Sequence, residues 1–585
     1  MKRLVILVSV LLMVAGFMFA APAIKNADTL IMLAPGDAVS LDPAVAYDNV
    51  SWSMLAVLYD RLLDYKGADL GTFVPTLATA VPTVANGGVS KDGKTYTFTI
   101  RSGVKFANGY ALTADDVAYS FKRDMITDPD SGPAWVWYQV LLGSGSQSRG
   151  DDGKIAVKYS DIDGAVTAKG NTVVFHLAKP YPAFMSVLAG KWGSIVSKKW
   201  VAEQGGWDGT EATWQQFNNP PTSKETLFNI ANGSGPYKLQ QWQKGVEIDV
   251  TRNDGYWGKK PALKNGVYKV VDEMATRKLQ LLQGDADIIY VPATNFPEMA
   301  AEKGIQIYKN LPALDLTGAH FNLNINDKGN SNIGSGKLDG QGIPSDFFAD
   351  KDVRLGFIYA WDEQQELKDG FNGNALDPVT FIPKGLPFKN PKLTSIPHDM
   401  EKAKAAFQRA MGGQVWDKGF KFDILFNSGN VERETAAHIL AENVMALNPK
   451  FQIGVRGLEW SQYSDENKNK RVPVLFMGWN PDYPDPDDYA QPYMSSSGYF
   501  AGRQSYNNAT ADDLVAKASV ELNATKRQAY YYQLQDIWLN DAIAIIFEQP
   551  LRQRFVKDWV KGYYYSPMES QEFELLPILS KSYAK

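Results

Sequence analysis

Residues 90–123 read SKDGKTYTFTIRSGVKFANGYALTADDVAYSFKR. Asp92-Gly93 is a hairpin signal, and large apolar side chains occupy every second position from residue 95 to residue 100, as in a half-buried strand. A second short strand is expected before the turn at Asn108-Gly109. Thr113 then starts a helix, because a threonine cap is followed by two acidic residues at the positive end of the helix dipole. The order of these signals along the chain predicts two strands, a glycine turn and a capped helix. We expect this segment to be structural scaffold that does not contact a ligand.

The length and composition describe a secreted globular protein of several lobes. A chain of 585 residues is too long for a single core. Residues 1–23 combine basic residues, an apolar run and small residues, as in a secretory signal peptide. The chain contains no cysteine, so we expect a periplasmic or extracellular protein without disulfides or an N-terminal lipid. The net charge of −5 argues against a nucleic-acid partner.

Four further motifs follow in a characteristic order. Residues 233–237 read GSGPY, and residues 252–258 read RNDGYWG after two alternating strands. A predicted amphipathic helix then ends in the GDAD of residues 284–287. HFNLN at 320–324 is followed, after a long insert, by DVR at 352–354 and a further helix over residues 355–362. Predicted strands alternate with predicted helices from there to residue 547, which indicates α/β lobes with partly parallel sheets.

These motifs resemble those of the family 5 extracellular solute-binding proteins, which are the oligopeptide- and dipeptide-binding components of ABC importers. The resemblance covers nearly the whole chain after residue 23. It implies a bilobal α/β periplasmic-binding-protein fold of the cluster C type, with an extra inserted domain and a hinge of two chain crossings, near Tyr290 and Phe547. The expected limits are 24–63, 181–291 and 548–585 for a discontinuous domain I, 64–180 for domain II and 292–547 for domain III.

The sequence GWNPDYPDP at residues 478–486 is the main candidate for ligand binding. It directly follows a predicted strand, at the carboxyl end where α/β sheets tend to bind ligands. Gly478, Trp479 and Asp482 match the GWxxDxxDP motif of the family, and the resemblance implies that Asp482 binds the ammonium group of a peptide. Tyr47 and Asp48, which follow the LDP motif of residues 41–43, are further candidate contacts.

Neither an enzyme nor a metal or cofactor site is predicted. The four histidines, His176, His320, His398 and His438, have no spacing that would place two on one helical turn, and no HExxH, GxSxG or phosphate-binding GxxxxGK[ST] motif occurs. Three polar inserts, at 143–153, 204–224 and 327–350, are interpreted as surface decoration, with loops that set ligand specificity as the alternative.

The sequence therefore predicts a monomeric solute-binding protein that captures peptides by hinge closure and delivers them to an ABC permease in the inner membrane. The 15 tryptophans and the aromatic fraction of 12% keep an oligosaccharide ligand open as an alternative, because sugar rings stack on aromatic side chains. A secreted hydrolase is the remote alternative.

Overall fold

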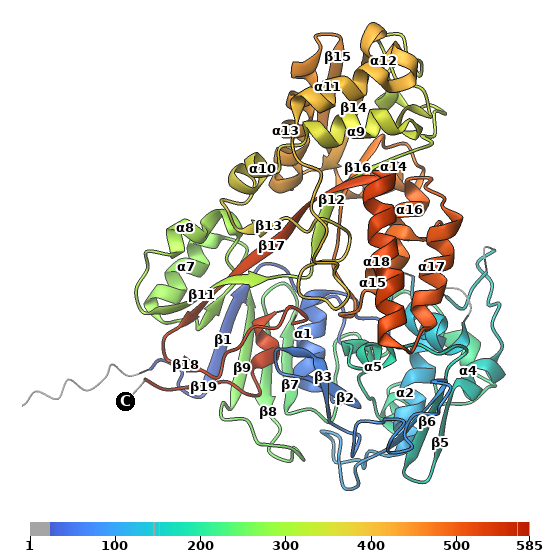
Figure 1. Cartoon of the computed structure of the whole chain (residues 1–585). Helices are drawn as coiled ribbons and strands as arrows, with labels where there is room; N and C mark the ends of the chain where they lie inside the picture. The colour runs from blue at the N-terminus through green and yellow to red at the C-terminus, as the bar shows by residue number, and fades with distance from the viewer. Residues whose placement is uncertain (1–23, 131, 144–146, 151, 570, 584–585) are drawn as a thin grey trace, which may run out of the picture.

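One long strand, β17 (Ala544–Lys557), takes part in the sheets of both lobes of the molecule (Figure 1). The computed structural model describes residues 24–130, 132–143, 147–150, 152–569 and 571–583. The predicted signal peptide, residues 1–23, lies outside this part. Within the described residues, no helix is long and apolar enough to cross a membrane.

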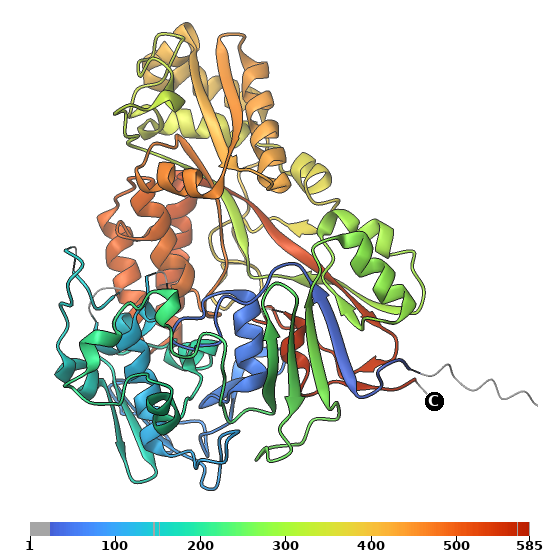
Figure 2. The same cartoon turned by 180° about the vertical axis from the view of Figure 1, so that it is seen from behind.

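The lower lobe contains the first part of the large sheet, in the order β17-β10-β1-β9-β8-β7, with β11 also paired with β17. Strand β1 is parallel to β9 and β10, whereas β7, β8 and β9 form antiparallel pairs. Figure 2 shows this sheet from behind, with β1 in blue beside the green strands. The strands are β1 (Thr29–Ala34), β7 (Tyr237–Gln243), β8 (Glu247–Arg252), β9 (Asn265–Val270), β10 (Ile288–Ile289) and β11 (Ile305–Pro312). The principal helices are α1 (Asn49–Leu58), α5 (Phe184–Leu188), α6 (Lys198–Glu203), α7 (Met274–Gln283) and α8 (Phe296–Met299).

The upper lobe contains the second part, in the order β15-β14-β16-β12-β17. Its strands are β12 (Leu316–Phe321), β14 (Phe420–Asn427), β15 (Phe451–Leu458) and β16 (Val474–Trp479), and the short β13 (Ala375–Leu376) pairs with β17. Its helices are α9 (Lys351–Ala360), α10 (Glu363–Asp369), α11 (Met400–Arg409), α12 (Gln414–Lys418), α13 (Val431–Leu447), α14 (Trp460–Lys468), α15 (Asp487–Met494), α16 (Tyr499–Arg503), α17 (Ala509–Val520) and α18 (Ala524–Asp541).

The upper sheet has a hydrophobic core on each face. In β16, Val474 and Phe476 belong to one core, whereas Leu475 and Met477 belong to the other. Because successive side chains of a strand point to opposite faces, both faces of a buried strand must be apolar. Helices α9, α11 and α13 cover one face and α15 to α18 cover the other (Figure 1). This two-sided burial confirms the predicted α/β lobes with partly parallel sheets.

The stretch from residue 90 to residue 123 forms β4 (Thr95–Thr99) and α2 (Ala114–Thr127), as predicted. The Thr113 side chain accepts a hydrogen bond from the Asp116 backbone, and the Asp116 carboxylate accepts one from the Thr113 backbone, which is a capping box. The second predicted strand is reduced to an isolated bridge between Lys105 and Ala111. Gly103 and Gly109 adopt φ values of +83° and +92°, so the chain turns on either side of this bridge.

The remaining elements of the lower lobe are a three-stranded sheet next to α2 and several short elements. Strand β4 pairs with β6, which pairs with β5. The other elements are β2 (Leu63–Lys66), β3 (Asp69–Pro75), β5 (Val166–Lys169), β6 (Thr172–His176), β18 (Val560–Lys561), β19 (Ser580–Lys581), α3 (Trp135–Trp137) and α4 (Tyr159–Ala165). The core of this region is continuous with that of the lower sheet.

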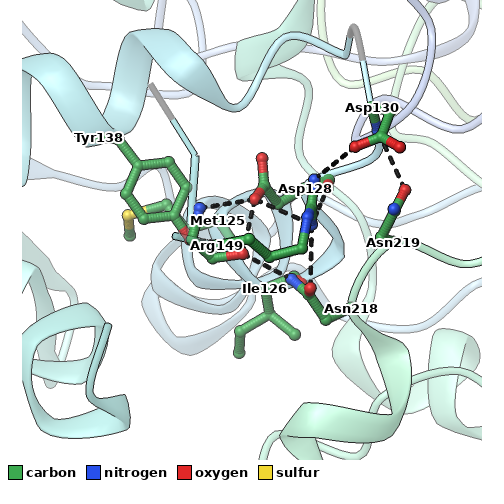
Figure 3. A network of polar contacts seen from close by, with 9 residues as sticks. Met125, Ile126, Asp128, Asp130, Tyr138, Arg149, Asn218 and Asn219 are labelled. Carbon is green, nitrogen blue, oxygen red and sulfur yellow. Dashed lines mark hydrogen bonds and ion pairs between the residues drawn. The ribbon is translucent and has the colours of Figure 1, made fainter. Parts of the chain in front are cut away.

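Two of the three polar inserts hold the carboxyl end of α2 (Figure 3). The Asn218 side chain donates a 2.8 Å hydrogen bond to the Ile126 carbonyl, and the Asn219 backbone donates a 2.7 Å hydrogen bond to the Thr127 carbonyl. Arg149 donates 2.8 Å hydrogen bonds to the Asp128 carbonyl and to the Asp130 carboxylate. These bonds satisfy carbonyls that a helix end leaves without intrahelical partners, so the described parts of both inserts have a structural role.

The strand pairing shows where the chain passes from the sheet of the lower lobe to that of the upper lobe. Strand β11 pairs with residues 551–557 of β17 in the lower sheet, and β12 pairs with residues 544–548 in the upper sheet. The chain thus changes sheets between Pro312 and Leu316, later than the expected limit at residues 291/292. The predicted domain limits as a whole stay predictions.

Candidate functional site

A cavity of about 620 Å³ lies where the two lobes meet, and all five predicted site residues line it. They come from segments far apart in the sequence: the turn before α1 supplies two, and the end of β16 with the loop after it supplies three. The five residues are Tyr47, Asp48, Gly478, Trp479 and Asp482. The structure therefore brings together what the sequence analysis selected from two separate motifs.

The Asp482 carboxylate joins the two segments that line the cavity. The Tyr47 hydroxyl donates a short hydrogen bond to Asp482, and the Trp135 indole nitrogen donates a 3.1 Å hydrogen bond to the Tyr47 oxygen. The Asp482 backbone donates a 2.8 Å hydrogen bond to the Asp488 carboxylate. Burial raises the pKa of the Asp482 carboxyl to about 7, which the hydrogen bond from Tyr47 opposes. Asp482 is thus poised to gain or lose a proton near neutral pH.

The other acidic residues of this loop hold it in place. Arg527 donates two hydrogen bonds of 2.9 and 2.7 Å to the Asp485 carboxylate, and both side chains are largely buried. Tyr181, from the lower lobe, donates a 2.7 Å hydrogen bond to Asp487. Neither Asp485 nor Asp487 lines the cavity, so these two carboxylates position the loop that carries Asp482.

The segment with Tyr47 and Asp48 is anchored to α2. Arg123, which lies on α2, donates hydrogen bonds of 2.6 and 2.5 Å to the two oxygens of Asp42. Both side chains are almost fully buried, and bidentate geometry fixes orientation as well as distance. The α2 scaffold thereby positions the turn that presents Tyr47.

The two carboxylate oxygens of Asp48 differ in their surroundings. Its Oδ1 atom accepts hydrogen bonds of 3.1 and 2.9 Å from the backbone of Val50 and Ser51, which caps the start of α1. Its Oδ2 atom is buried and has no hydrogen-bond partner among the described residues. Since a buried carboxylate oxygen is costly when unpaired, this atom is available for a donor on a ligand.

Gly478 and Trp479 form the wall at the end of β16. A side chain at Gly478 would lie 3.0 Å from the Thr317 hydroxyl oxygen and 3.1 Å from the Leu316 carbonyl oxygen, so a residue larger than glycine would crowd β12. The Trp479 ring packs against Tyr499 and Phe500. Two more tryptophans, Trp52 and Trp460, also line the cavity.

Arg433 is the site residue that the sequence analysis missed. It lies in the first turn of α13, directly after β14, and it lines the cavity. Its Nη1 atom donates a 2.7 Å hydrogen bond to Asn427, whereas its buried Nε atom has no hydrogen-bond partner among the described residues. The other arginine of the cavity, Arg552, forms an ion pair with Asp315. No carboxylate of the described chain forms an ion pair with Arg433, so its charge is available to an anionic group.

No metal site is apparent in the part of the chain that the structure describes, where no group of three or more His, Asp or Glu residues could hold an ion. His320 is fully buried and stacks on Phe500, with ring centroids 4.4 Å apart. Burial lowers the pKa of its imidazole to about 3. This histidine is a packed core residue.

Comparison with known proteins places these features in a family. The family model described as bacterial extracellular solute-binding proteins, family 5 (middle), matches residues 72–501. The probable D,D-dipeptide-binding periplasmic protein DdpA of Escherichia coli (strain K12) is 26% identical over 569 residues, which cover 97% of this chain and 96% of that protein. The dipeptide-binding protein of the same organism is 27% identical over 571 residues, which cover 94% and 95%.

A solved structure shows the same fold. The ABC transporter-associated periplasmic binding protein DppA of Helicobacter pylori, in complex with the peptide STSA, superposes with a TM-score of 0.70 at 21% identity. The superposition covers 94% of this chain and 98% of that protein. At this identity the likeness concerns the fold alone, and it confirms the bilobal α/β architecture expected from the sequence.

Proposed function

Because the chain belongs to the bacterial extracellular solute-binding proteins of family 5, we propose that it captures peptides between its two lobes and delivers them to an ABC permease. The similar proteins whose names state a dipeptide ligand support a peptide over other solutes. Each of them matches more than nine tenths of this chain, so the resemblance includes both lobes.

The observation that carries this proposal is a carboxylate and an unpaired guanidinium in one cavity. A peptide in water carries an ammonium group at one end and a carboxylate at the other. Asp482 can accept charge-assisted hydrogen bonds from the ammonium group, and Arg433 can donate them to the carboxylate. Asp48 Oδ2 is a further acceptor near the ammonium end. Tyr47, Trp479 and Gly478 complete the walls of the site.

We propose that the lobes close by bending where the chain crosses between the two sheets. The strand pairing favours crossings at residues 313–315 and 548–550. The second lies close to the expected position near Phe547, whereas the first lies after the expected position near Tyr290. A ligand that contacts both lobes favours the closed form by its differential affinity for that form.

Location and partners follow from the same assignment. The proposal includes a cleaved signal peptide over residues 1–23, a monomeric protein in the periplasm or outside the cell, and a permease in the inner membrane. The absence of cysteine from the sequence supports a protein without a lipid on an N-terminal cysteine.

Two measurements test the peptide assignment. Mass spectrometry of the small molecules released from gently denatured protein should detect peptides. In calorimetry, Asp482→Asn should weaken peptide binding by tenfold or more, because the ammonium group loses its charged partner. Unchanged affinity would remove Asp482 from the site, and release of a non-peptide solute would contradict the proposed ligand class.

An oligosaccharide is the second candidate, because three tryptophans, Trp52, Trp460 and Trp479, line the cavity. Indole rings can stack on the apolar faces of sugars. This candidate predicts a change in tryptophan fluorescence with cello- or xylo-oligosaccharides and none with peptides. The charged pair of Asp482 and Arg433 has no evident use for a neutral sugar, which favours the peptide.

A further inference from the structure

A second cavity, of about 380 Å³, adjoins the first between the lobes. The two cavities have five lining residues in common: Asn49, Asp315, Thr317, Arg433 and Arg552. The second cavity extends along β17, where Glu548, Pro550 and Leu551 line it. A ligand bound at Asp482 therefore has a second compartment within its reach.

Glu548 is the unusual residue of this compartment. Glu548 is almost fully buried, with 6% of its surface exposed. Its Oε2 atom has no hydrogen-bond partner among the described residues. A buried carboxylate oxygen is costly unless a donor or a cation satisfies it. Thr317 is hydrogen-bonded to the Glu548 carboxyl and Arg433 lies near it, but no group among the described residues satisfies Oε2. This atom is therefore available to a donor on a ligand.

The charges around Glu548 specify what that group is. Glu432 and Arg433 face it from α13, Asp315 from the turn before β12, and Glu366 from α10. Asp315 is paired with Arg552, and the Glu572 of the same cavity is paired with Arg554. Two carboxyl groups of the cavity, those of Glu432 and Glu548, thus remain beside the single guanidinium of Arg433, and Glu366 lies near Glu548 outside the cavity lining. The compartment favours a positively charged guest.

The register of the upper sheet gives the distance between the two compartments. Gly478 of β16 lies opposite Thr317 of β12, which lies opposite Glu548 of β17. Adjacent strands are about 4.8 Å apart, so the Gly478 and Glu548 backbones are separated by about 10 Å. Gly478 lines the same cavity as Asp482. An extended peptide advances about 3.3 Å per residue, so its third residue lies about 7 Å from its first. The side chain of that third residue can cover the remaining few ångströms to Glu548.

We propose that the Glu548 cavity binds the positively charged side chain of the third residue of a peptide whose ammonium group is held by Asp482. This inference rests on the proposed peptide-binding function and adds a preference for ligands with a basic third residue. Peptides that are shorter leave the compartment empty. Since no metal-binding cluster occurs among the described residues, the guest is an organic cation such as a lysine ammonium group.

The test compares two tripeptides that differ only in this charge, Ala-Ala-Lys and Ala-Ala-norleucine. Calorimetry on the full-length mature protein at pH 8, where about half of the Glu548 carboxyl is ionised, should show about fivefold tighter binding of the lysine peptide. A charge-assisted hydrogen bond in a buried site is worth about tenfold, and half-ionisation of the carboxyl costs about a factor of two. In Glu548→Gln this ratio should fall to about one. Glu434→Gln, an exposed glutamate on α13, is the matched control and should keep the full ratio.

Proton release gives a second readout, which a merely structural role of Glu548 would not produce. Burial raises the pKa of the Glu548 carboxyl to about 8, and the neighbouring Glu432 adds to this. At pH 7 the lysine peptide should therefore displace a proton that the norleucine peptide does not. Calorimetry in buffers of different ionisation enthalpy measures this difference. It should disappear in Glu548→Gln.

The outcomes separate this inference from the proposed function. If both tripeptides bind the wild-type protein equally well, or if Glu548→Gln keeps the preference, the inference is wrong while peptide binding stands. If neither peptide binds at any pH between 6 and 8, the proposed function is wrong and the inference with it. Should Glu548→Gln fail to fold, Glu432→Gln in the same cavity replaces it and should reduce the ratio.

Discussion

At the scale of single residues, the protonation state of Asp482 should control ligand affinity. Burial raises the pKa of this carboxyl to about 7, and only the ionised form pairs with an ammonium group. Binding of a neutral dipeptide such as Ala-Ala should therefore weaken as the pH falls from 7.5 to 5.5, by up to tenfold for each pH unit below 7. Titration calorimetry across this range measures the slope.

Two matched variants test whether the pH dependence of peptide affinity comes from Asp482. Asp482→Asn should bind weakly with no slope between pH 5.5 and 7.5, because the titrating group is gone. Asp465→Asn, an exposed aspartate of α14, should retain the wild-type profile. A slope that survives in Asp482→Asn would assign the titration to another group.

The residues that line the cavity differ in how readily they can be predicted from the sequence. Asp482 and Trp479 lie in a motif directly after an apolar strand, so local order revealed them. Arg433 belongs to no such motif. It reaches the cavity because β14, which precedes its helix, is paired with β16, with Leu425 opposite Leu475. Sequence analysis did not include this strand order, and without it an arginine at a helix start looks like a surface residue.

At the scale of secondary-structure elements, the inserts that cap α2 should contribute to stability and leave ligand binding unaffected. Asn218→Ala removes 2.8 Å hydrogen bonds to the Ile126 carbonyl and to Ser148, and the buried carbonyl then has no partner. We expect a loss of about 1–3 kcal/mol in the free energy of unfolding, measured by urea denaturation.

A neighbouring side chain provides the control for this prediction. Gln216→Ala, at an exposed position two residues away, should change the free energy of unfolding by less than about 0.5 kcal/mol. Peptide affinity should be unchanged in both variants, because neither residue lines the cavity. Weaker binding in Asn218→Ala would instead give the insert a role in specificity.

Elements with regular apolar patterns were predicted well, and β17 shows where the pattern fails. The strand expected over residues 542–547 continues to Lys557. The part of β17 after Phe547 contains Glu548, Arg552 and Arg554, which interrupt the apolar run because they face the space between the lobes. The polar residues that ended the prediction are thus the ones that line the ligand cavities.

At the scale of the whole molecule, the proposed hinge predicts that the lobes approach each other when a peptide binds. The natural chain has no cysteine, so two introduced cysteines can be labelled without background. Val246→Cys lies in the turn between β7 and β8 of the lower lobe, and Gln408→Cys lies on α11 of the upper lobe; both positions are exposed. Double electron–electron resonance between spin labels at these sites measures the distance between the lobes.

We expect peptide binding to shorten this distance by several ångströms, since closure around the cavity bends the chain at residues 313–315 and 548–550. The control pair, Gln408→Cys with Lys421→Cys, lies within the upper lobe and should keep its distance. Asp482→Asn should shift toward the short distance only at higher peptide concentration, because a ligand moves the equilibrium by its differential affinity for the closed form. An unchanged distance between the lobes at saturating peptide would rule out capture by hinge closure, even if the peptide binds.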